Sequence, residues 1–268
     1  MLIYGTNTYF RSNKVTQHGF CSLCSSYAKM RSFTAMLFLH LYFIPVIPIG
    51  SRKRSHKLCG KCNQCQQAFE PAVFDSIITR LKDQSADAIV ALKSGDATFD
   101  SDDPNEAPIE CVPFLHSAID WLYASNNVAF CESMLSQLTE PECRYAQTML
   151  RGALETYRGK PDDAINTYRE ASQIQPQSFQ PHHARGLLLA ARKKTIECIE
   201  AYRSAIACAT PDIEYQLRLE LVDIQTAAKQ YTDAAATFDW LLAAKPDLLS
   251  NKDFMKIVNK NKKKAGIA

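Results

Sequence analysis

Five of the ten cysteines stand at spacings that suit metal coordination. Cys21 and Cys24 form one Cys-x-x-Cys pair, and Cys59, Cys62 and Cys65 form a Cys-x-x-Cys-x-x-Cys run. Two thiolates separated by two residues can both face one cation from a single tight turn, and two such turns supply four tetrahedral ligands. The spacing therefore predicts a structural zinc site of four cysteines, which leaves no coordination position for a reacting water.

The segment between the two cysteine groups must bring them together. Residues 33–49 carry no charge and have high β-propensity, whereas Pro45 and Pro48 oppose a continuous central strand or a regular helix. These features favour a hairpin with an extended Pro-containing arm. A membrane-spanning helix over residues 33–49 is the alternative. Such a helix would separate the cysteine groups by the bilayer, so the two groups could not share one zinc ion.

The first 71 residues carry motifs in a recognisable order. These are Ile3-Tyr-Gly-Thr, Cys21-x-x-Cys24, Phe43-Ile-Pro-Val-Ile-Pro-Ile-Gly50, and a closing Cys-x-x-Cys followed by an apolar residue and Pro71. The set resembles the small zinc-ribbon family found at the start of many otherwise unrelated proteins. The resemblance implies a zinc-binding β-hairpin module with ligands at Cys21, Cys24 and one pair from the closing run.

The closing run offers two ligand pairs. The resemblance favours Cys62 with Cys65, because residues 65–71 match the way the family leaves its second cysteine pair. Turn chemistry favours Cys59 with Cys62, because Leu58 could end a strand and Asn63 tolerates a left-handed backbone. We predict zinc ligands at Cys21, Cys24, Cys62 and Cys65, with Cys59 as the alternative ligand.

From residue 110 onward the sequence repeats with a period of 34 residues. Matching positions are Gly152 and Gly186, Ile165 and Ile199, Tyr168 and Tyr202, and Ala171 and Ala205. A third unit follows after a two-residue slip, and residues 112–141 are similar to a degenerate earlier unit. The pattern resembles the tetratricopeptide family. The resemblance implies a solenoid of helical hairpins, in which Gly and Ala allow close helix packing and aromatic residues fill the space between hairpins.

The same resemblance implies a concave groove, lined by the first helix of each hairpin, that binds a protein or peptide. The candidate groove residues are Met149, Ala153, His183, Leu187, Gln216 and Leu219. The Lys, Asn and Arg set with which some family members hold a terminal carboxylate does not occur at these positions. Binding of a chaperone tail is therefore not expected.

Charge is segregated along the chain. Residues 1–70 carry nine Lys or Arg against one acid, residues 71–143 carry three against thirteen, and residues 252–268 carry six Lys against one Asp. We therefore expect four segments. These are a zinc ribbon at 1–71, a helix with an acidic linker at 72–109, the helical array at 110–250, and a Lys-rich tail at 251–268 that starts as a short helix and frays.

Basic residues cluster beside the second cysteine group. Arg52, Lys53, Arg54 and Lys57 are candidate phosphate contacts, because zinc ribbons often touch nucleic acid and cations attract phosphates without regard to sequence. The alternative is a hairpin tip whose charges are simply solvated.

The sequence as a whole predicts a mainly α protein: a helical-hairpin solenoid with a small N-terminal β zinc ribbon. Catalytic motifs such as a Gly-rich phosphate loop, Gly-x-Ser-x-Gly or His-Glu-x-x-His do not occur, so an enzyme is not expected. The leading hypothesis is a non-catalytic interaction or scaffold protein with structural zinc and a protein partner. The alternatives are nucleic-acid association through the basic loop and tail, and membrane attachment through residues 33–49.

The use of cysteine in this sequence indicates which cellular compartment to expect. The sequence shows no secretory signal, and half of the cysteines stand at metal-ligand spacing, so we expect a reducing compartment: the cytoplasm, with the nucleus as the alternative. The other five cysteines lie in apolar, helix-like sequence and are expected to be small buried hydrophobic residues. These are Cys111, Cys131, Cys143, Cys198 and Cys208.

Overall fold

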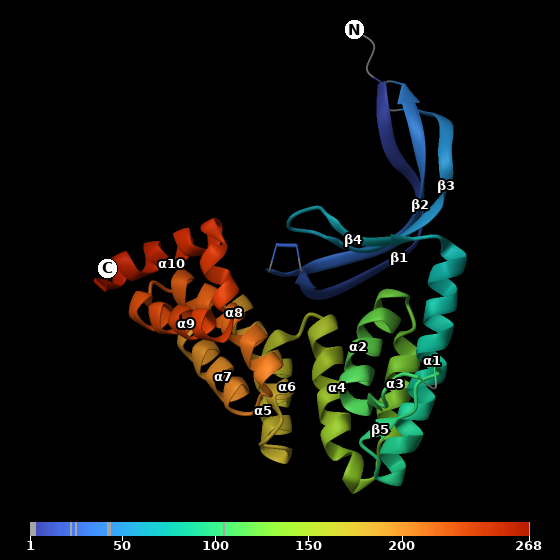
Figure 1. The fold of residues 1–268 in the computed structure, drawn as a ribbon. Coiled ribbons are helices and arrows are strands. Elements are labelled where there is room, and N and C mark those ends of the chain that lie inside the picture. The colour runs from blue at the N-terminus through green and yellow to red at the C-terminus, as the bar shows by residue number, and fades with distance from the viewer. Residues whose placement is uncertain (1–3, 22, 25, 42–43, 104, 268) are drawn as a thin grey trace. The chain divides into compact units, whose positions relative to one another are not determined.

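The computed structural model describes residues 4–21, 23–24, 26–41, 44–103 and 105–267. The chain divides into two compact units, Met1–Thr167 (unit 1) and Tyr168–Ala268 (unit 2). Within the described residues, a four-stranded antiparallel sheet is followed by ten α-helices (Figure 1). The predicted class, a helical array with a small β module at its start, is confirmed.

Unit 1 starts with the sheet, whose strand order is β1-β2-β3-β4. The strands are β1 (Tyr4–Cys21), β2 (Ser26–Leu41), β3 (Ile44–Cys59) and β4 (Cys65–Phe69). The register of β1 against β2 shifts between Tyr9 and Ser12 and again between Ser12 and Val15. Irregularities of this kind bend a strand and increase its twist. Figure 1 shows the first three strands as long, curved ribbons.

The uncharged segment 33–49 is divided between two strands. Residues 33–41 belong to β2 and residues 44–49 to β3, while residues 42–43 lie outside the described residues. The strands pair antiparallel, with Met30 opposite Cys59, so the predicted hairpin is present. Pro45 and Pro48 stand opposite His40 and Phe38, where register shifts occur. Proline has no backbone N–H to donate to the neighbouring strand, and the register shifts accommodate the missing hydrogen bonds. Strand β3 therefore continues through both prolines. No described helix is long and apolar enough to span a membrane.

The helices of unit 1 share one core with one another. They are α1 (Pro71–Ser94), α2 (Cys111–Ala124), α3 (Val128–Gln137) and α4 (Arg144–Tyr157), with a short 3-10 turn at Pro141–Cys143. Phe74 and Ile78 of α1 pack in the same cluster as Leu115, Met134 and Leu150. The cluster also buries Cys111, Cys131 and Cys143, as expected for small hydrophobic residues. Because α1 supplies part of this core, it packs as a member of the helical layer.

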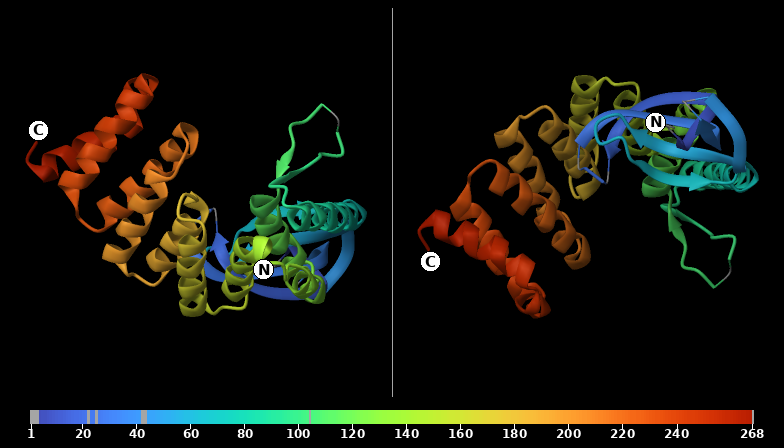
Figure 2. Two further views of the ribbon diagram at one scale, coloured as in Figure 1. Left: turned by 90° about the horizontal axis from the view of Figure 1, so that it is seen from below. Right: turned by 90° about the horizontal axis from the view of Figure 1, so that it is seen from above.

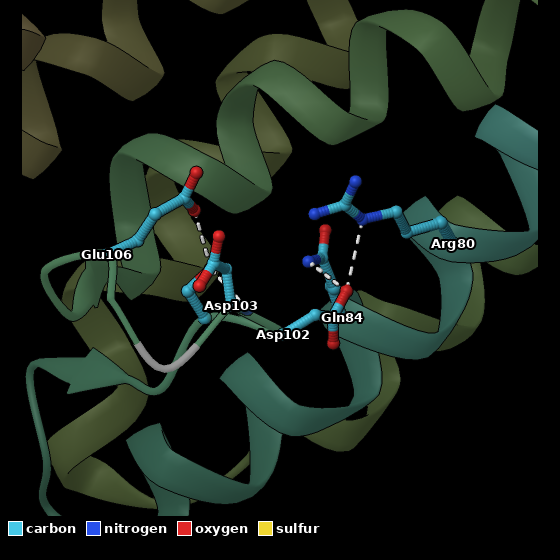
Figure 3. Close-up of polar contacts among 6 residues, drawn as sticks. Arg80, Gln84, Asp102, Asp103 and Glu106 are labelled. Atoms are coloured by element: carbon cyan, nitrogen blue, oxygen red, sulfur yellow. Dashed lines mark hydrogen bonds and ion pairs between the residues drawn. The ribbon is translucent and has the colours of Figure 1, made fainter.

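The acidic stretch after α1 is tied to that helix. Its ends pair as β5 (Thr98–Phe99) and β6 (Ile109–Glu110), and the segment between them projects from the helices (Figure 2). Asp102 accepts hydrogen bonds from Arg80 Nε at 3.0 Å and from Gln84 Nε2 at 2.8 Å (Figure 3). The expected linker is therefore a short hairpin anchored on α1 through Asp102.

The remaining helices follow in hairpins. They are α5 (Pro161–Ile174), α6 (Phe179–Ala191), α7 (Thr195–Ala207), α8 (Pro211–Ala227), α9 (Tyr231–Ala244) and α10 (Lys252–Ala265), with a 3-10 turn at Pro246–Ser250. α5 crosses the boundary between the units.

One turn geometry recurs between paired helices. Asn126, Gly159, Lys193 and Lys229 all have a left-handed backbone, with φ of 68°, 76°, 59° and 61°. In each case the next amide donates to the carbonyl five residues earlier, as Lys194 N does to Leu189 O at 2.9 Å. Gly159, Lys193 and Lys229 are 34 and 36 residues apart, which reproduces the period and the two-residue slip in the sequence. The repeat-like character of the helical region is therefore structural, and the hairpin formed by α2 and α3 belongs to the series.

Close packing in unit 2 depends on glycine and aromatic residues, as predicted. A Cβ on Gly186 would lie 2.9 Å from the Tyr202 ring, so α6 and α7 approach more closely than another residue at 186 would allow. Tyr202 and Phe238 are almost completely buried.

The Lys-rich C-terminal segment is helical rather than frayed. The Asn251 side chain caps α10 by accepting from the amides of Asp253 and Phe254, both at 3.1 Å. Val258 is buried in the same cluster as Phe238 of α9. An apolar stripe along the Lys-rich segment thus holds it to the preceding hairpin.

Candidate metal centre

Four cysteine thiols meet at one end of the sheet. Cys21 is the last residue of β1 and Cys59 the last residue of β3, and Cys24 and Cys62 lie in the segments that follow these strands. Strand pairing brings the two groups together, because β2 pairs with β1 up to Cys21 and with β3 up to Cys59. The long apolar strands therefore act as the arms that close this centre.

The spacing of the sulfur atoms is that of a tetrahedral thiolate site. Cys21 Sγ lies 3.8 Å from Cys62 Sγ, and Cys24 Sγ lies 3.8 Å from Cys59 Sγ. All four sulfurs are within 4.8 Å of one another. A regular tetrahedron with zinc–sulfur bonds of about 2.3 Å has sulfur–sulfur edges of about 3.8 Å. The four thiols and the distances between them thus fit a divalent metal ion that binds sulfur at about 2.3 Å.

The backbone after Cys59 is shaped to present thiols. Gly60 N donates to Lys29 O at 2.9 Å, and a Cβ on Gly60 would lie only 2.8 Å from the same oxygen, so this position requires glycine. Asn63 has φ of 55°, the left-handed conformation that the sequence indicated for it. Lys61 N donates to Cys59 Sγ at 3.3 Å. The turn therefore directs an amide N–H at a ligand sulfur.

The thiols of this cluster differ in acidity. Burial raises the pKa of Cys59, but hydrogen bonds from the Cys62 and Lys61 backbone and from the Cys21 and Cys62 thiols lower it to about 7 overall. For Cys62 the Gln64 backbone lowers the pKa, whereas burial and sharing of protons with the other thiols raise it to about 11. One thiolate is thus stabilised by its neighbours, which is the form that binds metal.

Cys65, which the sequence favoured as a ligand, does not join the cluster. Cys65 is the first residue of β4, where it pairs with Leu58 of β3. Its thiol donates to the carbonyls of Gln67 at 2.9 Å and His56 at 3.3 Å. The geometry instead selects Cys59, the alternative ligand. The reason is strand register, because pairing of β3 with β4 commits Cys65 to the strand while Cys59 and Cys62 flank the turn.

Sequence reasoning missed the contacts that attach the sheet to the helices of unit 1. Asp120 of α2 forms an ion pair with Lys57 and accepts from Gln17 Nε2 at 2.8 Å. Tyr27 Oη donates to Thr156 O at 2.6 Å, and burial raises the pKa of Tyr27 to about 12. These pairs are 63 to 129 residues apart, so no local spacing in the sequence indicates them.

His56 is a further buried contact between sheet and helices. Its ring stacks on Trp121 with centroids 4.3 Å apart, and neither ring nitrogen has a hydrogen-bond partner among the described residues. Burial, with the nearby charges of Lys57 and Arg54, lowers the pKa of His56 to about 3. The imidazole is therefore neutral and packs as an aromatic ring.

The four predicted phosphate contacts differ in how accessible their charges are. All four lie on strand β3 and not on a loop. Arg52 and Lys53 are exposed, whereas Arg54 is buried and Lys57 is paired with Asp120. Residues 52–57 are therefore not a uniformly solvated basic tip.

The predicted groove residues also differ in their burial. Met149 and Ala153 are buried, and Ala153 belongs to the core of unit 1, so neither offers surface to a partner. His183, Leu187 and Leu219 are partly exposed and Gln216 is exposed. Only the four residues in unit 2 retain accessible surface.

No protein-family model matches the chain, and no curated protein matches it. The metal centre is therefore supported by its geometry and donor chemistry.

Proposed function

We propose that Cys21, Cys24, Cys59 and Cys62 bind one structural zinc ion. The observation that carries this proposal is the pair of 3.8 Å sulfur–sulfur distances within a four-thiol cluster. Four thiolates complete the tetrahedral shell that zinc adopts in structural sites. Such an ion would clasp the ends of β1 and β3 and would leave no position for an activated water, so we propose no catalytic role.

Metal content of two matched variants tests this assignment. Elemental analysis of the purified full-length protein is expected to give one zinc per chain. Cys59→Ser should lower that content, and Cys65→Ser, the same change six residues away and outside the cluster, should leave it unchanged. The reverse result would exclude the proposed ligand set. Iron in place of zinc would contradict the identity of the metal.

We further propose that the protein is an interaction or scaffold protein whose helical hairpins bind a protein or peptide. Support comes from the accessible surface of α6 and α8, the first helices of two hairpins. His183 of α6 contacts Glu220 of α8 at 2.8 Å, and Tyr202 Oη donates to the same carboxylate at 2.7 Å. Leu187 and Leu219 provide apolar surface on the same two helices. Apolar side chains bordered by polar groups are typical of protein interaction surfaces.

The groove proposal is best tested in the full chain. A bait that starts at residue 110 would lack α1 and expose the core that contains Phe74. A partner captured by the full-length protein should be lost when Leu187 is changed to Lys and Gln216 to Lys. The control is Ile196→Lys on α7, where the side chain is 72% exposed. Retention of the partner by the variant with Leu187→Lys and Gln216→Lys, as by the Ile196→Lys control, would contradict binding in this groove.

Nucleic-acid binding is the second candidate, and the exposed face of α10 favours it. Lys252, Lys256 and Lys260 are exposed and recur every four residues, so they lie along one face of the helix. Lys262 pairs with Asp239 and is less available. Affinity for an oligonucleotide should fall steeply with salt, and replacing the three lysines by Gln should reduce that dependence. A salt-independent interaction would exclude this function.

The compartment proposed for this protein is a reducing one, the cytoplasm. None of the ten cysteines forms a disulfide, and Cys111, Cys131, Cys143 and Cys198 are buried. Buried free thiols and a thiolate metal site both suit a reducing environment.

A further inference from the structure

Unit 1 contains a cavity of about 440 Å³ between the sheet, the start of α1 and the turn that joins α2 to α3. Three cations line it, Lys14 from β1 and Arg52 and Arg54 from β3, against one described acid, Asp75. Phe74 and Ile78 provide an apolar part of its wall. A volume of a few hundred Å³ is typical of small-molecule sites. Most of the lining residues are polar or charged, so the cavity suits a charged ligand with a smaller apolar part.

Arg54 is the least ordinary residue in this wall, because it is a buried cation with no ion pair in the described part of the chain, and Asp75 of the same wall is the acid whose charge acts on it. Its side chain is only 5% exposed. Nη1 donates to Asn13 O at 2.5 Å and Nη2 to Ala124 O at 3.0 Å, while Nε has no hydrogen-bond partner among the described residues. Within the same residues, no carboxylate forms an ion pair with it. A buried charge is costly unless it is paired, and desolvation lowers the pKa of Arg54, while the negative charge of Asp75 opposes that shift only in part.

The backbone around the cavity is irregular in ways that shape it. The register of β1 shifts on both sides of Ser12, and Asn13 has φ of 49°. This irregularity directs the Asn13 carbonyl to Arg54 and places Lys14 in the wall. On the opposite side, Asn126 has φ of 68° in the turn after α2. Strand irregularities often re-aim side chains beside functional sites.

The remaining cations are available to a ligand. Lys14 and Arg52 are exposed, and neither forms an ion pair within the described part of the chain. Arg52 and Arg54 are two residues apart on β3 and therefore project from the same face of the sheet. Lys53, between them, projects from the other face and does not line the cavity.

We propose that this cavity binds a small organic anion, with a phosphate or carboxylate group held by Lys14, Arg52 and Arg54 and the organic part against Phe74 and Ile78. An oxyanion would balance the positive charge that the single acid Asp75 leaves uncompensated on Lys14, Arg52 and Arg54. Guanidinium groups suit both phosphate and carboxylate because their N–H donors match pairs of oxygens. The limited volume and the apolar part of the wall favour a small molecule over a polyphosphate backbone.

The test is titration of the full-length, zinc-loaded protein with phenyl phosphate, benzoate and inorganic phosphate, followed by calorimetry and by amide chemical shifts. Saturable binding of one phenyl phosphate or benzoate per chain, with shifts at residues 12–15, 52–54 and 125–127, is the expected result. The two organic probes distinguish a phosphate ligand from a carboxylate ligand. Inorganic phosphate should bind more weakly because it makes no apolar contact.

Charge-neutral variants decide whether the cavity itself is responsible. Arg52→Gln and Lys14→Gln should each weaken binding about tenfold, since a charge-assisted hydrogen bond is lost. Lys53→Gln removes the same charge from the same strand but from the opposite face, and it should leave affinity unchanged. Both test residues are exposed, so folding should be preserved, unlike a change at buried Arg54.

Several outcomes would overturn the proposal. Equal weakening by Lys53→Gln would show attraction to general surface charge. Shifts centred on Lys29, Arg31 and Lys61 would place the anion in the separate basic cavity beside the cysteine cluster. Binding of an oligonucleotide without binding of either organic probe would assign the surface to nucleic acid. Absence of saturable binding by all three probes would exclude the site.

Discussion

The cysteines of the sheet and the cysteines of the helices show how two environments use one side chain. Cys59 receives an amide N–H and neighbouring thiols, and its pKa is about 7 despite burial. Cys131 lies in the core of unit 1, where burial raises its pKa to about 12. Neither side chain is accessible to solvent, but Cys131 lies much deeper in the protein interior than Cys59. The difference lies in the depth of burial and in the donors around the sulfur, so the first thiol suits metal binding and the second is a packing residue.

If the proposed zinc ion is bound, its removal should have the largest effect on the cysteines of the sheet. Structural zinc sites in small domains contribute on the order of 10 kcal/mol to folding. We expect a strong chelator to accelerate hydrogen exchange at the ends of β1 and β3 and to leave exchange in α6 to α9 unchanged. Unchanged exchange near Cys21 and Cys59 after chelation would show that the sheet does not depend on a metal.

A change within the helical group should lower stability without touching the metal. Cys131→Ser places a hydroxyl in an apolar core and is expected to lower the free energy of unfolding by about 2 kcal/mol. Zinc content should stay at the wild-type value. Chemical denaturation and elemental analysis of the same sample check both parts. Loss of zinc would mean that the two groups of cysteines are coupled.

Burial also acts on His56, whose pKa is lowered to about 3. The unfolded chain binds a proton at this residue below about pH 6.5 and the folded chain does not, so stability falls as the pH drops from about 6.5 towards 3. This loss approaches about 1.4 kcal/mol per pH unit. His56→Phe should keep the stack on Trp121 and remove that part of the pH dependence.

Denaturation of wild type and His56→Phe between pH 7 and pH 5 gives the difference directly, and acid loss of zinc affects both proteins alike. Parallel curves would contradict a neutral, buried imidazole.

The smallest effect is expected at Cys65, the cysteine that belongs neither to the four-thiol cluster nor to the helical cores. Its thiol is partly exposed and donates to carbonyls only. A serine hydroxyl can make the same donations, so Cys65→Ser should change the free energy of unfolding by less than about 0.5 kcal/mol. A larger loss of stability, measured with zinc present, would give Cys65 a structural role that its contacts do not indicate.

The sequence determined those features that depend on neighbouring residues. The Cys-x-x-Cys spacings place two thiols on one turn, and the left-handed Asn63 was indicated by its type alone. The 34-residue period in Gly, Ala and Tyr predicted the helical hairpins, because each hairpin packs by the same local rules. The prediction that residues 33–49 form a hairpin followed from proline chemistry and from the need to join both cysteine groups.

Tertiary structure decided the features that depend on register and long-range packing. Pairing of Leu58 with Cys65 assigned Cys65 to a strand and left Cys59 to the cluster. The docking of the sheet on α1 and α2 turned Arg54 and Lys57 inward, although by type they were expected to face water. A chain can specify a turn by itself, but which face of a strand is buried depends on partners as far as 129 residues away.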